Sequence, residues 1–270
     1  MSAPSYPVSL PVGSKAPLAT LHHPTSTLWE FEMHNGKDNR LTVTFLRECL
    51  SVALDIVEKD WRTQNGASPG GPGALIISGK QDQDKFFSNG LDFEAIVGDQ
   101  GFFPNTFNPT IRKLLTFPIP TIAAINGHAF AAGFITTLAC DYRVMQASKG
   151  WCSMNEILFG APMPTSFAAI MRYKLPSPSM LRGVVMEAKR YTGKELLELG
   201  VVDAVADNGA GVMKAARELA AARGDLAKTG VWGIMKKDLM RETLKLVDAD
   251  FRTERPPEEA AAAKLRLSKL

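Results

Sequence analysis

The sequence predicts an α/β core followed by an α-helical C-terminal region. Short apolar runs typical of buried strands alternate with helix-like stretches between Leu28 and Met145, whereas the pattern from Thr165 onward is mostly helical. Hydrophobic residues make up 45% of the 270 residues and charged residues 22%, which excludes a disordered chain. This length permits one large domain or two modest ones, with a sizeable core.

Each expected element follows from its local pattern. Leu28–Met33 alternates apolar and charged residues like a half-buried strand, and apolar residues recur at helical spacing from Val43 to Trp61. The uncharged apolar runs at 74–78 and 121–125 are typical of buried strands, and the Gly- and Pro-rich stretch 65–73 indicates a loop. Further strands are expected at 142–145 and 201–205, and further helices at 133–140, 179–188, 193–199, 211–222 and 231–247.

The charge balance and the cysteines exclude several classes of protein. The chain has 31 Lys and Arg against 28 Asp and Glu, an excess too small and too scattered to indicate nucleic-acid binding. Lys264, Arg266 and Lys269 near the C-terminus alone supply three positive charges. The three cysteines lack CxxC spacing and the four histidines form no HExxH pair, so we expect no metal site. An odd cysteine number also favours a reducing, intracellular compartment.

Two segments bear on membranes and cellular address. The stretch 114–140 carries no formal charge and is long enough to span a membrane, but its prolines and glycines favour a buried strand–turn–helix. We therefore expect no membrane span. The chain ends on Ser268-Lys269-Leu270, the tripeptide read by the peroxisomal import receptor. The alternative is the frayed end of a Lys- and Leu-rich helix, but the terminal position favours the address and a peroxisomal matrix protein.

Several common motifs are incomplete. Gly79-Lys80 follows a predicted strand, but a phosphate-binding P-loop would need Gly at position 74 and Ser or Thr at position 81. The turn at 71–73 precedes its strand rather than following it, so a dinucleotide fingerprint also fails. The sequence contains no Gly-x-Ser-x-Gly elbow.

Three segments have the composition of a reactive site. In the segment Phe86–Asp92, a Gly precedes the expected start of a helix. Unpaired backbone N–H groups at that start could hold an oxyanion. The alternative is that the segment is an ordinary turn. The small residues of Asn126–Gly133 would let a second helix N-terminus approach a ligand, unless they serve only tight packing. In Met154–Gly160, Glu156 directly precedes an apolar run. Desolvation there would raise its pKa and suit proton transfer, the alternative being a capping or salt-bridging glutamate.

In this order and spacing, the three segments resemble the crotonase superfamily, also called the enoyl-CoA hydratase/isomerase family. The similarity covers roughly residues 28–205 and includes the strand Pro120–Gly127, Cys140-Asp141 and the element Gly200–Val202. Within the family, the chain is most similar to the peroxisomal delta-3,delta-2-enoyl-CoA isomerases of plant type. The resemblance implies a crotonase-like ββα spiral core and a homotrimer or dimer of trimers. The expected organisation is an N-terminal extension at 1–27, the core at 28–205, a helical oligomerisation region at 206–267 and the targeting tripeptide at 268–270.

The resemblance also implies the residues of the site. The backbone N–H groups of Leu91 and Ala132 would form an oxyanion hole for the thioester carbonyl of an acyl-CoA. The expected substrate-binding residues are Ser88, Asn89, Gly90, Asp92 and Asn155. CoA is part of the substrate, so no separate cofactor, metal, nicotinamide or flavin is expected.

One departure from the family pattern distinguishes between its reactions. Glu156 matches the later of the two glutamates that hydratases use, whereas Ile135, beside Phe134, occupies the position of the earlier one. An isoleucine cannot orient or deprotonate water, so we expect an isomerase of fatty-acid β-oxidation in which Glu156 moves a proton from C2 to C4 of a 3-enoyl-CoA. Asp92 is expected near a helix start and His128 as a packed or surface side chain. Hydration, other acyl-CoA chemistry and a non-catalytic acyl-CoA-binding trimer stay open as alternatives.

Overall fold

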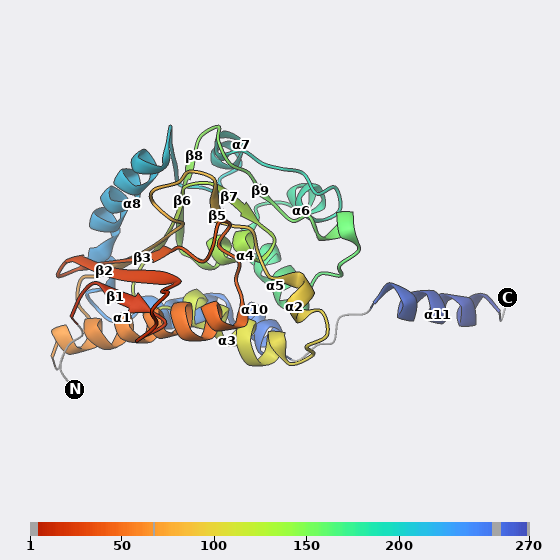
Figure 1. The fold of residues 1–270 in the computed structure, drawn as a ribbon, viewed down its shortest axis with the longest axis horizontal. Coiled ribbons are helices and arrows are strands. Elements are labelled where there is room, and N and C mark those ends of the chain that lie inside the picture. The colour runs from red at the N-terminus through yellow and green to blue at the C-terminus, as the bar shows by residue number, and fades with distance from the viewer. Residues whose placement is uncertain (1–4, 67, 250–254, 269–270) are drawn as a thin grey trace.

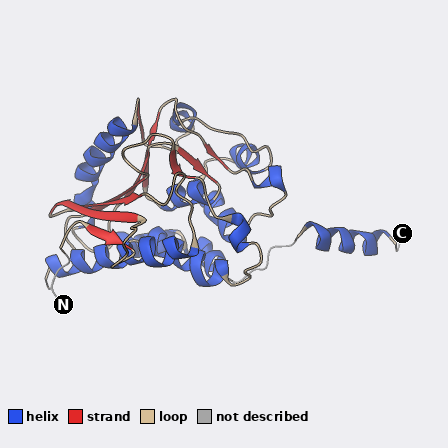
Figure 2. Cartoon of the chain, in the orientation of Figure 1, coloured by secondary structure: helices blue, strands red, loops and turns tan. Residues whose placement is uncertain are grey.

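Two β-sheets form the centre of the fold, which the computed structural model describes for residues 5–66, 68–249 and 255–268. Figures 1 and 2 show helices on both sides of the larger sheet. The larger sheet has the order β1-β2-β3-β4-β6-β8-β10 and the smaller has the order β5-β7-β9. The strands are β1 (Val8–Leu10), β2 (Ala19–Thr25), β3 (Leu28–Met33), β4 (Ala74–Ser78), β5 (Phe86–Ser88), β6 (Thr121–Ile125), β7 (His128–Phe130), β8 (Tyr142–Gln146), β9 (Cys152–Ser153) and β10 (Ala204–Ala206).

The larger sheet is parallel from β3 to β10, with β1 and β2 paired antiparallel at one edge. Both faces of a parallel sheet are covered, so its strands read as continuous apolar runs, as β4 and β6 do. Along β4 and β6, successive side chains point to opposite faces of the sheet and pack in two separate hydrophobic cores. Ile76 and Ile122 pack toward α8, whereas Ile77 and Ile125 belong to the larger core on the other face.

Helix α8 (Gly209–Arg223) covers one face of the larger sheet. The Asn208 side chain caps its N-terminus by accepting a hydrogen bond from the Gly211 N–H at 2.8 Å. From α8, Arg217 reaches the buried Glu30 on β3 with two hydrogen bonds, of 2.6 Å and 2.9 Å. This bidentate ion pair fixes the helix on the sheet.

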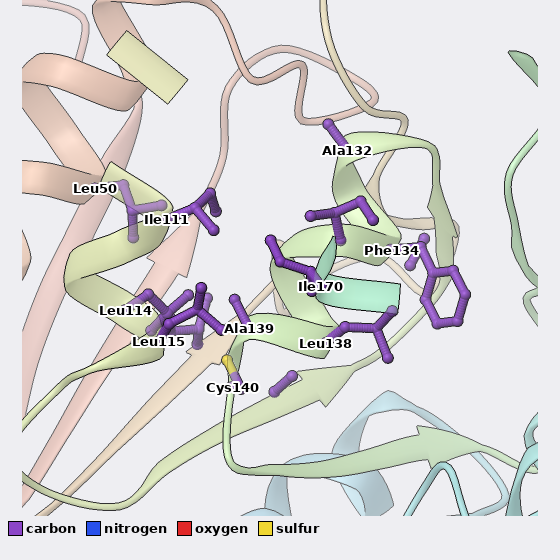
Figure 3. Packing of buried hydrophobic residues seen from close by; sticks show 14 of the residues in the cluster. Leu50, Ile111, Leu114, Leu115, Ala132, Phe134, Leu138, Ala139, Cys140 and Ile170 are labelled. Carbon is purple, nitrogen blue, oxygen red and sulfur yellow. The ribbon is translucent and has the colours of Figure 1, made fainter. Parts of the chain in front are cut away.

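Helices of the N-terminal and central chain cover the opposite face. They are the π-helical turn η1 (Phe45–Leu50) continuing into α1 (Ser51–Gln64), η2 (Phe103–Phe107) continuing into α3 (Asn108–Leu115), and the helices α4 (Ala132–Ala139) and α5 (Thr165–Lys174). Every residue of α4 is buried. Figure 3 shows Ala139 and Leu138 of α4 in the same buried cluster as Leu114 of α3 and Ile170 of α5. The core therefore holds α4, and with it Ala132, from several sides.

Asp141, two residues beyond the end of α4, anchors a C-terminal helix. Its carboxylate accepts hydrogen bonds from the Thr121 N–H at 2.9 Å and from Trp232 at 3.2 Å, and it pairs with Lys236 of α9 (Trp232–Leu239) at 2.8 Å. The remaining helices and 3-10 turns are α2 (Phe93–Ile96), η3 (Glu156–Phe159), α6 (Pro178–Val185), α7 (Gly193–Glu198), η4 (Gly224–Ala227), α10 (Arg241–Asp248) and α11 (Pro256–Leu267). Figure 1 shows α11 apart from the body of the molecule.

The N-terminal part of the fold differs from the sequence prediction in two places. Strands β1 and β2 lie within residues 1–27, which the sequence assigns to an extension, and β2 pairs with β3. The sheet therefore begins before residue 28. Val43, expected on the buried face of the first helix, is 36% exposed because it lies in the first helical turn, ahead of the buried stretch.

Two C-terminal predictions also need correction. The strand expected at 201–205 begins only at Ala204, because the N–H of Val201 still bonds to the Leu196 carbonyl at the end of α7. The helix expected at 231–247 is two helices, α9 and α10, which meet at Met240 with φ −103° and ψ 18°.

The uncharged stretch 114–140 forms the end of α3, strands β6 and β7, and α4, as the strand–turn–helix interpretation predicts. Among the described residues, no helix combines the length and the apolar composition needed to cross a membrane.

Candidate active site

A cavity of about 590 Å³ lies where α2, η2, η3 and the start of α5 meet. Its lining is largely apolar, with four phenylalanines contributed by four different elements: Phe93, Phe103, Phe159 and Phe167. Of the residues predicted from the sequence, the cavity brings together Asn89, Leu91, Asn155 and Glu156. The others, Ser88, Gly90, Asp92 and Ala132, do not line it and are placed next to it by the chain.

The first loop of the site follows β5. Its centre, Gly90, has φ +81°, a conformation that glycine adopts without strain. The Gly90 carbonyl accepts a hydrogen bond from the Leu41 N–H at 2.9 Å. The amide of Leu91 belongs to the same peptide unit, so its N–H points away from Leu41, and it meets no acceptor in the described part of the chain. Leu91 therefore offers a free donor beside the cavity.

The second loop follows β7 and leads into α4. Ala131 precedes the helix with φ +52° and ψ −125°, a strained conformation for a residue with a Cβ. Its own N–H bonds to the Ser153 carbonyl on β9 at 2.9 Å, which fixes the strained turn. Ala132 is the first residue of α4, where backbone N–H groups lack a partner within the helix, and its N–H also meets no acceptor among the described residues.

Glycines bring the two loops into contact. A Cβ placed on Gly90 would lie 2.9 Å from the Phe130 carbonyl oxygen and 3.4 Å from the Ala132 nitrogen. A Cβ placed on Gly133 would lie 2.4 Å from the Ser88 carbonyl oxygen. Only glycine permits this close approach, which brings the backbone of the first loop against the start of α4 at Ala132.

Glu156 opens the 3-10 turn η3 and is half-buried at the cavity. Loss of water raises the pKa of its carboxyl group from 4.5 to about 7, although hydrogen bonds from the N–H groups of Glu156 and Asn155 act in the opposite direction. No cation pairs with Glu156 among the described residues, so the salt-bridge interpretation lacks a partner. A carboxyl group with such a pKa can both accept and release a proton near neutral pH.

The resemblance to the family places Ile135 at the position of a second glutamate in hydratases. Ile135 lies in α4 with no exposed surface, beside the equally buried Phe134. Neither side chain can bind or activate water. Among the described residues, the carboxylates that line the cavity are those of Glu156 and Asp99.

Asp92 and His128 lie where the sequence predicts them. Asp92 immediately precedes α2 without making a side-chain cap. His128 lies on the outer face of the smaller sheet, where its ring stacks on Phe130 at 5.1 Å and accepts a hydrogen bond from the Trp151 N–H at 3.1 Å. Burial, with Arg190 and Lys85 nearby, lowers the pKa of His128. In the described residues, no three His, Cys, Asp or Glu side chains are grouped as a metal site.

The sequence did not indicate the segment that holds the first loop. The Asp38 carbonyl accepts the Asn89 N–H at 2.9 Å, and Arg40 donates to the carbonyls of Asn89 and Leu91. These contacts join positions about fifty residues apart in the chain, and local spacing carries no signal for them.

Comparison with known proteins identifies the family of the chain. Residues 25–254 match the family described as enoyl-CoA hydratase/isomerase. The chain belongs to the enoyl-CoA hydratase/isomerase family. This match confirms the resemblance inferred from the sequence and extends it from residue 205 into the C-terminal helices.

Two of the named relatives come from Arabidopsis thaliana. The chain is 34% identical over 183 residues to enoyl-CoA delta isomerase 3, a match that covers 64% of this chain and 76% of the relative. It is 38% identical over 145 residues to enoyl-CoA delta isomerase 2, peroxisomal, covering 50% of this chain and 60% of the relative.

Solved structures of the enoyl-CoA hydratase/isomerase family share the fold. An enoyl-CoA hydratase/isomerase family protein from Pseudomonas syringae superposes with a TM-score of 0.74 at 23% identity, over 86% of this chain and 94% of that one. Human mitochondrial delta3-delta2-enoyl-CoA isomerase gives a TM-score of 0.69 at 22% identity, over 86% and 88%. These likenesses confirm the crotonase-like core.

Proposed function

We propose that the protein is a delta-3,delta-2-enoyl-CoA isomerase, which converts a 3-enoyl-CoA into the conjugated 2-trans-enoyl-CoA. One observation carries the proposal: the cavity is lined by Glu156, whose pKa is raised, and by Leu91, and the backbone N–H groups of Leu91 and of nearby Ala132 meet no acceptor among the described residues. The resemblance to the family places the buried Ile135 at the position of the second hydratase glutamate. The Arabidopsis relatives named enoyl-CoA delta isomerase support the same reaction.

In the proposed mechanism, Glu156 as a carboxylate removes a proton from C2 of the substrate. The electron pair of the C–H bond forms a dienolate, and the negative charge develops on the thioester oxygen. The N–H groups of Leu91 and Ala132 stabilise that oxygen as its charge grows, and one such donor is worth about 3 kcal/mol in other enzymes. Glu156 then returns the proton to C4, so the double bond moves from C3 to C2.

The pKa of Glu156 suits both halves of this cycle. The same group must be a base at C2 and an acid at C4, and a pKa of about 7 makes both protonation states accessible near neutral pH. The reaction is an internal redistribution of one proton and one double bond. It consumes no oxidant or reductant, so we propose that no nicotinamide, flavin or metal takes part.

We also propose that the protein acts in the peroxisomal matrix in fatty-acid β-oxidation. Ser268 follows α11 and is exposed, whereas Lys269 and Leu270 of the predicted address lie outside the described residues. Two of the Arabidopsis relatives carry peroxisomal in their names. A fluorescent protein fused to the N-terminus should enter peroxisomes, and removal of the last three residues should leave it outside. Unchanged peroxisomal import of the truncated chain would refute recognition of the tripeptide.

A homotrimer, or a dimer of trimers, is proposed from the helices of region 206–267. Helix α9 leaves Ile234, Met235 and Leu239 58%, 59% and 70% exposed on one side. An exposed apolar stripe of this kind is typical of an interface between subunits. Light scattering of the purified protein would test it: a monomer at micromolar concentration would contradict the proposal.

The reaction itself is tested with a series of 3-enoyl-CoA and 2-enoyl-CoA substrates of increasing chain length. We expect conjugation of the 3-enoyl compounds, visible as new absorbance of the 2-enoyl thioester, and little hydration of the 2-enoyl compounds. Efficient loss of conjugation from 2-enoyl-CoA would instead identify a hydratase. Tight acyl-CoA binding without turnover at any chain length would identify a non-catalytic binding protein.

A further inference from the structure

The first loop of the site has its backbone polar groups bound by the segment Asp38–Leu41. Asn89 donates its N–H to the Asp38 carbonyl at 2.9 Å, and the Gly90 carbonyl accepts from the Leu41 N–H at 2.9 Å. The Asn89 side chain adds a hydrogen bond of 2.9 Å to the Asp38 carboxylate. The N–H of Leu91, a residue that lines the cavity, has no acceptor among the described residues, so its direction depends on how firmly the neighbouring peptide units are held.

Arg40 holds the peptide units on both sides of that donor. One guanidinium nitrogen, Nη1, donates to the Asn89 carbonyl at 3.2 Å and to the Leu91 carbonyl at 2.9 Å. No other donor to these two oxygens exists in the described part of the chain. The Nε of Arg40 bonds to the Asp38 carboxylate at 3.0 Å, which orients the guanidinium plane.

This contact contributes little to stability but much to geometry. The Arg40 side chain is 41% exposed, and an ion pair this exposed contributes little to folding. Without Arg40, the carbonyls of Asn89 and Leu91 could turn toward water, and the peptide units around Gly90 could rotate. A shift of about 1 Å in a group that acts on the transition state can reduce the rate about 100-fold.

We propose that Arg40 is a positioning residue of the oxyanion hole, which fixes the Leu91 N–H by bridging the carbonyls on either side of it. Asp38 supports it by orienting the guanidinium group. The inference rests on the proposed function, because it assigns Arg40 a role in stabilising the dienolate. It predicts a specific division of effects: the rate constant of turnover depends on Arg40, whereas ground-state binding of an acyl-CoA does not.

The test compares Arg40→Ala and Arg40→Lys with a matched control. Arg47→Ala removes another arginine that bridges distant segments, from η1 to Thr106 and the Asn105 carbonyl, but does not line the cavity. We expect Arg40→Ala to lower kcat by about 10- to 100-fold. The dissociation constant of a saturated acyl-CoA should change by less than about threefold, and the melting temperature should stay near that of the wild type. Arg47→Ala should leave kcat unchanged.

Two further readouts distinguish positioning from a general structural effect. Added guanidinium ion at low concentration should restore part of the kcat of Arg40→Ala and none in Arg40→Lys, whose ammonium group already occupies the site. An Asp38→Asn variant keeps Arg40 and replaces the Asp38 carboxylate by an uncharged amide of nearly the same size. Its fall in kcat should be smaller than that of Arg40→Ala. An unchanged kcat in Arg40→Ala, or a weaker binding of acyl-CoA that accounts for the whole effect, would overturn the proposal.

Hydrogen exchange separates this inference from the proposed reaction. Loss of Arg40 should speed exchange of the bonded amides of Asn89, Gly90 and Leu41 relative to the Arg47→Ala control, whatever the enzyme converts. Unchanged exchange would refute the positioning role even if the protein is an isomerase. If the wild type shows no turnover but Arg40→Ala shows faster exchange, the proposed reaction is refuted, whereas the role of Arg40 in holding the loop is supported.

Discussion

The raised pKa of Glu156 predicts how the rate of the proposed reaction depends on pH. Loss of water raises the pKa of this carboxyl group from 4.5 to about 7 in the folded protein. The free enzyme needs the carboxylate as its base, so kcat/KM should increase with pH through about 7 and level off above it. A glutamate with an ordinary pKa would give a profile that is already level at about pH 6.

The same pKa also sets a pH-dependent cost in stability. The folded-state pKa lies above the unfolded value, so the unfolded chain ionises first as the pH increases. The free energy of unfolding of the wild type should therefore fall, relative to Glu156→Gln, between about pH 4.5 and about pH 7 and stay lower above that range. The two pKa values differ by about 2.5, and a difference of one in pKa corresponds to about 1.4 kcal/mol, so the fall is at most about 3 to 4 kcal/mol.

Urea unfolding of the two proteins at about pH 5 and about pH 8 measures this difference. Glu198→Gln is the matched control, because Glu198 ends α7, is exposed and does not line the cavity. The stability gain from Glu156→Gln should be larger at about pH 8 than at about pH 5, and the control should show no such trend. Equal differences at both pH values, together with a level rate profile, would refute the desolvation of Glu156.

Three other substitutions test the geometry of the site. Ala131→Gly relieves a φ of +52° and should raise the free energy of unfolding by up to about 1 kcal/mol with turnover retained; a loss of stability in urea would contradict the strain. Gly90→Ala forces a Cβ to 2.9 Å from a carbonyl oxygen of β7 and should abolish most turnover, whereas Gly200→Ala, with a similar φ of +70° and open space, should not. Phe159→Ala removes the ring that meets Phe93 edge to face at 5.5 Å at the cavity, so the affinity for short acyl-CoA ligands should fall by a few fold relative to long ones. An equal change in affinity for acyl-CoA ligands of every chain length would refute this role of Phe159.

The elements that the sequence predicts well are those with a strong periodic or apolar pattern. Strands β4 and β6 have the expected bounds because a parallel central strand is apolar on both faces. Strands β5, β7 and β9 were missed, because they have only two or three residues each and their pairing is decided by distant neighbours. Strand β2 was missed because two histidines interrupt its apolar pattern.

The site was predictable only in part for similar reasons. Glu156, Leu91 and Ala132 stand next to local signals: an apolar run, a Gly before a helix and a cluster of small residues. Arg40 carries no such signal, because its role depends on carbonyl groups that the fold brings to it. The strain at Ala131 was equally hidden, since the sequence shows an alanine but not its φ of +52°.

The central claim is that Glu156 alone moves the proton between C2 and C4 of a 3-enoyl-CoA. Its most direct test is the rate of conjugation of a 3-enoyl-CoA by the purified wild type and by Glu156→Gln under saturating substrate. We expect turnover by the wild type and a fall of about 10²- to 10⁴-fold in the variant, with acyl-CoA binding retained. Near-wild-type conjugation by Glu156→Gln would refute the role of Glu156 as the base.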